Sequence, residues 1–202
     1  MALMSTATTS ATSSAPRLRP AALCGAFAGL LIALSALVEA FTGETSATSC
    51  LLAVSPAFAL PLLTALHLAQ GAVTGRYADT AHTLNVIGLG LFGGGAFAAN
   101  LVLFYFDEEV IEETLTGPTV PVLIGSAAVF AVGCAAFGAA MIRARVFPRV
   151  PAWGYAVVLP AFAFLTALPD SPLTIALHVM VGTILVWLSA ALSGTRRLAV
   201  RD

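Results

Sequence analysis

The stretch "AALCGAFAGLLIALSALVEAF", residues 21–41, contains one charged side chain, Glu39, and otherwise consists of apolar or small residues. A helix needs about 20 such residues to cross the hydrocarbon core of a bilayer. This run is therefore long and apolar enough to form a transmembrane helix. Arg17 and Arg19 precede it and Glu44 follows it, so its two ends carry opposite charge.

The whole chain shares this composition. Its 202 residues are 59% hydrophobic and only 9% charged, and the mean hydropathy is +0.96. Soluble domains carry about 25% charged residues, so the sequence predicts an integral membrane protein. A net charge of −1 provides no basic field for nucleic acid. The nine basic residues are all Arg, which excludes a lysine Schiff base and, with abundant alanine, indicates a bacterial genome rich in G and C.

The apolar runs predict an all-α fold, a bundle of six transmembrane helices. Residues 1–20, rich in Ser, Thr and Ala, are expected to form a disordered cytoplasmic tail. The six-helix transmembrane domain is expected over residues 21–193, with a basic cytoplasmic tail over residues 194–202. The connections are short, apart from the acidic segment "DEEVIEETLTGP" at residues 107–118. The expected spans are residues 21–41, 50–73, 82–106, 119–142, 152–169 and 172–193.

With six spans, every Arg falls on the same side of the membrane. The positive-inside rule makes this side the cytoplasm and predicts a multi-pass protein of the plasma membrane with both termini inside. Glu44, the segment 107–118 and Asp170 then face outward, and Trp153 and Tyr155 are expected in the inner aromatic belt. The Arg residues are Arg17, Arg19, Arg76, Arg143, Arg145, Arg149, Arg196, Arg197 and Arg201.

The first apolar run leaves one alternative open. Arg17 and Arg19, the apolar run and the sequence "VEA" before Phe41 loosely fit a signal peptide with a cleavage site. The long tail before the basic residues and the length of the run favour a retained first helix.

Two of the three histidines lie in similar settings, in "PLLTALHLAQG" at residues 61–71 and "PLTIALHVMVG" at residues 172–182. His67 and His178 are expected to differ in depth by roughly 15 Å at 1.5 Å per helical residue, too much for two axial ligands of one haem. The three cysteines are scattered, without the spacing of a metal site or redox pair. We therefore expect no metal and no cofactor.

Polar side chains inside a membrane-spanning bundle are costly and by default suggest function. Toward the cytoplasmic side, His67 and Gln70 of the second span and His82 and Asn85 at the start of the third form a candidate polar cluster. His67 and His82 are expected at similar depth, and no third metal ligand is apparent. Asn100 is a further polar residue of the third span, near its outer end.

A second candidate group lies toward the outer side and consists of Glu39, His178 and Asp170. Glu39 would be a partly desolvated carboxylic acid able to donate a proton, with His178 as relay and Asp170 as cation stabiliser. The alternative for Glu39 is a charge that snorkels at the membrane boundary. The acidic residues of segment 107–118 are expected to form a solvated helix end, because no calcium-binding loop is present.

The stretch "GAAMIRARVFPRVPAWGYAVVLPAF", residues 138–162, resembles a passage that recurs in uncharacterised six-helix bacterial membrane proteins, known as domains of unknown function. In these proteins a span ends in a basic turn with a Pro-Arg pair, here Pro148 and Arg149, and a new span begins at once. The resemblance implies a six-helix fold and assigns no catalytic residue.

Two functions fit the sequence. The first is a small-molecule-binding, transport-associated or partner-stabilising bundle, with membrane lipid around it, a hydrophobic small molecule as ligand and a second copy or a membrane protein as partner. The second is a membrane-embedded acid–base enzyme, such as a cyclase or isomerase, that acts on a lipid-like or isoprenoid substrate from the outer half of the bundle. No phosphate loop, nucleophile elbow or metalloprotease motif is present to decide between them.

Overall fold

The computed structural model describes residues 18–71, 75–166, 168 and 171–199, with the side chains of residues 195–199 excepted. These residues are helical and contain no β-strand, which confirms the all-α prediction. The helices are α1 (Arg19–Thr42), α2 (Ser46–Gln70), α3 (Gly75–Leu101), the 3-10 helix η2 (Leu103–Tyr105), α4 (Glu108–Thr114), α5 (Thr119–Ala144), α6 (Arg149–Leu165) and α7 (Pro172–Ala199).

Short, well-defined caps set the helix ends. Pro20 lies in the first turn of α1. Gly43 ends this helix with φ 72°, a conformation that glycine adopts without strain, and its N–H donates to the Glu39 carbonyl. Thr45 and Thr48 then form a capping box that starts α2. Because this turn is tight, Glu39 and Glu44 lie at the same end of the bundle.

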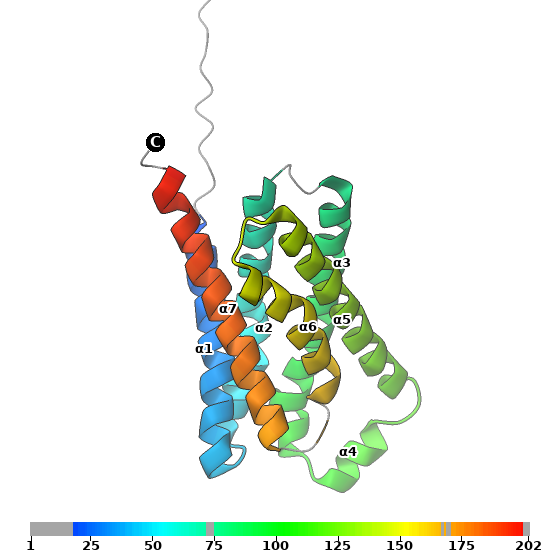
Figure 1. Cartoon of the computed structure of the whole chain (residues 1–202). Coiled ribbons are helices and arrows are strands. Elements are labelled where there is room, and N and C mark those ends of the chain that lie inside the picture. Colours follow the sequence, from blue (N-terminus) through cyan, green and yellow to red (C-terminus); the bar gives the residue numbers. More distant parts are fainter. Residues whose placement is uncertain (1–17, 72–74, 167, 169–170, 200–202) are drawn as a thin grey trace, which may run out of the picture.

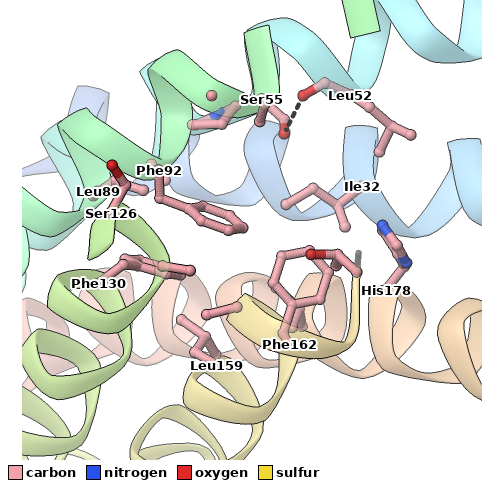
Figure 2. Close-up of a pocket in the computed structure, with 18 of the residues that line it drawn as sticks. Ile32, Leu52, Ser55, Leu89, Phe92, Ser126, Phe130, Leu159, Phe162 and His178 are labelled. Atoms are coloured by element: carbon pink, nitrogen blue, oxygen red, sulfur yellow. Dashed lines mark hydrogen bonds between the residues drawn. The ribbon is translucent and has the colours of Figure 1, made fainter. Parts of the chain in front are cut away.

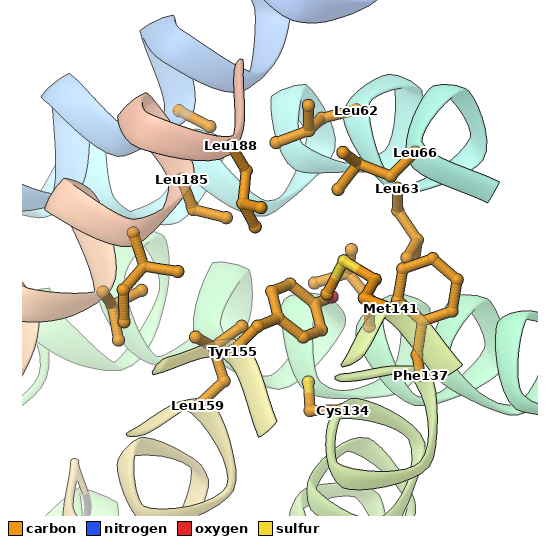
Figure 3. Packing of buried hydrophobic residues seen from close by; sticks show 14 of the residues in the cluster. Leu62, Leu63, Leu66, Cys134, Phe137, Met141, Tyr155, Leu159, Leu185 and Leu188 are labelled. Atoms are coloured by element: carbon orange, nitrogen blue, oxygen red, sulfur yellow. The ribbon is translucent and has the colours of Figure 1, made fainter. Parts of the chain in front are cut away.

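The six long helices form a closed ring (Figure 1). Each helix packs on its neighbours in the order α1, α2, α3, α5, α6 and α7, and α7 packs back on α1. Side chains on the inner faces fill one half of this ring, as Figure 3 shows for Leu66, Phe137, Met141 and Leu188. These four are completely buried, with exposed fractions of 0% each.

Glycines bring neighbouring helices of the ring into close contact. A methyl group at Gly133 of α5 would lie 2.6 Å from the Cα atom of Asn85 in α3. One at Gly29 of α1 would lie 2.5 Å from the carbonyl oxygen of Gly182 in α7. Small residues at such crossings allow the backbone contact that holds helices together in lipid, where water provides no driving force.

The bundle has two chemically different ends. The described Arg residues lie at the starts of α1, α3 and α6 and at the end of α5, which all meet at one end, called here the basic end. The opposite end carries Glu44 and the short helix α4 with its four glutamates, and is called the acidic end. The expected acidic segment 107–118 therefore contains an exposed helical turn.

Five helices of the described chain are long and apolar enough to cross a membrane: α1, α2, α3 with η2, α5 and α7. The helix in the region of the fifth expected span, α6, has 17 residues. Large hydrophobic side chains cover the outer face, for example Leu23 at 72% and Phe41 at 90% exposure. An apolar outer face of this kind suits a membrane-embedded bundle, because lipid tails then contact it directly.

Two helix bounds differ most from the expected spans. Helix α3 begins at Gly75, seven residues before the expected start at residue 82, so that His82 and Asn85 lie within the helix. Helix α7 continues to Ala199, into the expected basic tail. Hydropathy marks where a helix is apolar, and polar turns such as that around Arg76 and Asp79 extend helices beyond the apolar run.

Candidate functional site

The half of the ring toward the acidic end is hollow. A cavity of about 710 Å³ is lined by residues of all six long helices. Along α2 it extends from Leu52 to Leu66, which corresponds to roughly 20 Å at 1.5 Å per helical residue. Its outer end reaches Glu44 and Thr166 at the acidic end, and its floor is formed by Leu66 and Tyr155 near the middle of the bundle.

Aromatic rings line one wall of the cavity (Figure 2). Phe92 of α3 and Phe130 of α5 stack with ring centroids 4.7 Å apart, and Phe162 of α6 meets Phe92 edge-on at 6.1 Å. His178 of α7 lies edge-on against Phe162 at 4.9 Å. The remaining walls are mainly aliphatic, so the interior is apolar with few polar groups.

Those polar groups include two residues of the outer candidate group. Glu39 and His178 both line the cavity, and both are half-buried. One carboxylate oxygen of Glu39 is shielded from solvent. Asp170, the third member, lies outside the described residues. Asn100 also lines the cavity, toward the acidic end, and donates a hydrogen bond of 2.9 Å from its amide to the Ala96 carbonyl.

The hydrogen bond of His178 defines which ring nitrogen is available for chemistry. Its Nδ1 lies 2.8 Å from the Thr174 carbonyl oxygen. A carbonyl only accepts, so Nδ1 carries the proton and the neutral ring presents a lone pair at Nε2. His178 therefore has one nitrogen held by the backbone and one able to accept a proton or a hydrogen bond.

The inner candidate cluster forms a separate site, in the filled half near the basic end. The rings of His67 in α2 and His82 in α3 stack with centroids 4.3 Å apart and planes 11° apart. Nε2 of His67 lies 3.3 Å from a carboxylate oxygen of Asp79. Gln70 is buried nearby in sequence, and its amide donates to the Leu66 carbonyl at 3.2 Å.

This histidine pair does not form a metal site. Parallel stacked rings direct their nitrogen lone pairs into separate planes, whereas a metal ion needs lone pairs that converge. Within the described parts of the chain, no group of three or more His, Cys, Asp or Glu side chains is arranged to hold a metal ion.

Asn85 belongs to a third polar group, which the sequence analysis missed. Its amide donates to the Tyr155 hydroxyl at 2.7 Å, and its carbonyl oxygen accepts from the Cys134 thiol at 3.3 Å. Tyr155 is only 4% exposed, so its expected place in an aromatic belt is wrong. The missed signal is the spacing of Tyr155, Leu159 and Ala163, which repeats every four residues and forms the buried stripe of α6.

Comparison with known proteins assigns no family to this chain. No protein-family model, curated protein sequence or solved structure matches it. The resemblance of residues 138–162 to six-helix proteins of unknown function therefore stays a prediction.

Proposed function

We propose that this chain crosses a bacterial plasma membrane six times, with both termini in the cytoplasm. The fold supports a sixth crossing by α6, because α5 ends at the basic end and α7 begins at the acidic end. The chain must return through the height of the bundle between them. The 17 residues of α6 cover about 26 Å, at the short end of the range for transmembrane helices.

The charge asymmetry supports the orientation. The described Arg residues gather at the basic end, and the positive-inside rule assigns such an end to the cytoplasm. A fluorescent protein fused after Asp202 should therefore fluoresce in the cytoplasm, and alkaline phosphatase inserted after Glu112 should be active outside. Phosphatase activity from the fusion after Asp202 would contradict this topology.

Within this topology, we propose that the protein binds an apolar small molecule in the cavity of the acidic half. The observation that carries this function is the cavity itself, about 710 Å³ with apolar walls and a few polar groups. Ligand pockets have volumes of about 300–1,000 Å³ and this balance of apolar walls and isolated polar groups. A bundle without such a role would gain stability by filling the space.

Native mass spectrometry of the protein in nanodiscs tests this function. A bound molecule should be released from the wild type and be depleted in Ala127→Phe. Ala127 lies midway along the α5 wall, one turn from both Leu123 and Phe130, so a phenyl ring there divides the cavity. Ala135→Phe is the matched control, because Ala135 is an exposed residue of the same helix. Equal occupancy in the two variants would contradict binding in this cavity.

A second candidate function is an acid–base enzyme with a lipid-like substrate. The observation that favours it is the common cavity of Glu39 and His178, which gives a carboxyl group and a free imidazole Nε2 in an apolar interior. Glu39→Gln should then abolish turnover of any substrate found, while the yield of folded protein stays unchanged. Undiminished turnover in this variant would exclude the enzyme in this form.

A further inference from the structure

The charges around the cavity all have the same sign. Glu39 and Glu44 line it, and no Arg is among the lining residues in the part of the chain that the structure describes. The Arg residues whose side chains the structure describes lie at the basic end, beyond the filled half of the bundle. His178 adds no positive charge in its neutral form, and its Nε2 accepts hydrogen bonds. A ligand in the cavity therefore meets acceptors and negative charge.

We propose that the cavity is selective for a cationic amphiphile, that is, a hydrophobic amine or alkylammonium compound. This inference rests on the proposed binding function and specifies its ligand class. The cationic group lies beside Glu39, with Glu44 nearer the mouth, and the apolar part extends along the aromatic wall toward Tyr155. Lipids and fatty acids whose only charge is negative are excluded.

The shape of the cavity supports an elongated ligand. Its walls extend from Leu89 to Asn100 along α3 and from Tyr155 to Thr166 along α6, roughly 16 Å each at 1.5 Å per residue. The polar groups Glu39, Glu44 and Asn100 lie toward the acidic end of this length, whereas its deeper part is apolar. A molecule with one polar end and one apolar end matches this gradient.

One side of the cavity has an apolar rim that faces outward. Ile124 of α5 and Phe164 of α6 line the cavity and are also 59% and 49% exposed. In a membrane this rim borders lipid tails, so an amphiphile already dissolved in the bilayer reaches the cavity without leaving an apolar environment.

The sign of the ligand's charge strongly affects its affinity for the cavity. Opposite charges attract, and like charges repel, far more strongly in a low-dielectric interior than in water. A cation beside Glu39 recovers in this attraction part of the free energy that it loses in hydration, whereas an anion loses hydration and is also repelled.

Three radiolabelled probes with a chain of ten carbon atoms test the proposal: decyltrimethylammonium, decanol and decanoate, whose chain includes the carboxylate carbon. Scintillation proximity measures their binding to the full chain in phosphatidylcholine nanodiscs, and empty nanodiscs correct for partitioning into lipid. We expect the ammonium compound to bind about tenfold more tightly than decanol, equivalent to about 1.4 kcal/mol. Decanoate should give no signal above empty nanodiscs.

Two matched variants identify the residue responsible. Glu39→Gln should weaken binding of the ammonium probe to the level of decanol and leave decanol unchanged. Glu112→Gln removes a charge from α4 at the same end of the bundle but outside the cavity lining, and should change neither. The elution volume in size-exclusion chromatography shows whether each variant is folded, and unchanged decanol binding shows whether the cavity is intact.

The possible failures are distinguishable. If the wild type binds none of the three probes, the proposed binding function fails, and the charge selectivity with it. If decanol or decanoate binds as tightly as the ammonium compound, the cavity binds amphiphiles and only the charge selectivity is wrong. If Glu39→Gln leaves ammonium binding unchanged, Glu39 is not the recognition group and the proposal is overturned.

Discussion

The two halves of the bundle are built from the same six helices, yet one is solid and the other hollow. Toward the basic end, Phe137, Met141 and Leu188 are fully buried and none of them lines the cavity. Toward the acidic end, the same ring encloses a cavity of about 710 Å³. Length and hydropathy of the helices do not explain this difference, because each helix passes through both halves.

The packing of α5 explains why one half of the bundle is filled and the other is hollow. From Ser126 onward the inner face of α5 is buried, and Gly133 and Gly138 make backbone contact with α3 and α6. The first turns of α5, residues 119–125, are exposed, and a methyl group added at Gly125 would meet no other helix within 4 Å. Leu123 and Ile124 of this segment still line the cavity, so α5 stays part of the ring but packs loosely on its neighbours toward the acidic end. The backbone contacts at Gly133 and Gly138 both lie in the solid half.

The largest effect is expected where a side chain is enlarged in the solid half. Ala131 is 6% exposed and belongs to the packed core, away from the cavity lining. Ala131→Leu adds three carbons where there is no space, so we expect a loss of about 3 kcal/mol in the free energy of unfolding. Unfolding by sodium dodecyl sulfate in mixed micelles measures this loss.

Ala127→Leu is the matched change in the hollow half, one turn away on the same face of α5. Ala127 is also buried, at 9% exposure, but it lines the cavity. Its enlargement fills empty space and should stabilise the protein by about 0.5–1 kcal/mol. Equal destabilisation by both substitutions would show that the acidic half is as densely packed as the basic half.

A smaller effect of the same kind is expected at two glycines of α5. Gly133→Ala places a methyl group 2.6 Å from Cα of Asn85, so α3 and α5 must separate, at a cost of about 2 kcal/mol. Gly125→Ala meets nothing and should stabilise the helix by about 0.5–1 kcal/mol. Measured free energies of unfolding should therefore decrease for Gly133→Ala and increase for Gly125→Ala. Stabilisation by Gly133→Ala would show that the helices are farther apart than described.

The hydropathy of the sequence predicts where the helices lie, but it does not predict how tightly each part of a helix packs on its neighbours. Every backbone polar group in lipid must be satisfied within its own helix, so apolar runs of this length predict helices reliably. The expected span 119–142 matches α5 within a few residues. Nothing in that run distinguishes residues 119–125, which are exposed, from the later residues, whose inner face is buried. The cavity arises from this looser packing, and no single residue encodes it.

The candidate residues illustrate the same limit. Depth along a helix is readable from sequence, so the similar depth expected for His67 and His82 agrees with their stacking in the structure. Rotation and long-range pairing are harder to read. Asn85 pairs with Tyr155 across 70 positions of the chain and with Cys134 across 49. Each of these residues has an ordinary interpretation when considered alone.

The smallest effect is expected at the boundary between the two halves, where the Tyr155 hydroxyl accepts the Asn85 amide below the cavity floor. Tyr155→Phe keeps the ring and leaves that amide without this acceptor, so we expect a loss of about 1 kcal/mol. Tyr105→Phe is the control, because Tyr105 is 61% exposed, and should change the unfolding free energy by less than about 0.5 kcal/mol.

The double variant Asn85→Ala with Tyr155→Phe then separates pairing from packing. If the Tyr155 hydroxyl stabilises the protein through Asn85, Tyr155→Phe should hardly change the free energy of unfolding of a chain that already carries Asn85→Ala. A double-mutant cycle measures this difference directly. A full loss in that background would mean that the hydroxyl has another partner. The wall between the solid and hollow halves would then depend on Tyr155 through a contact other than its bond to α3.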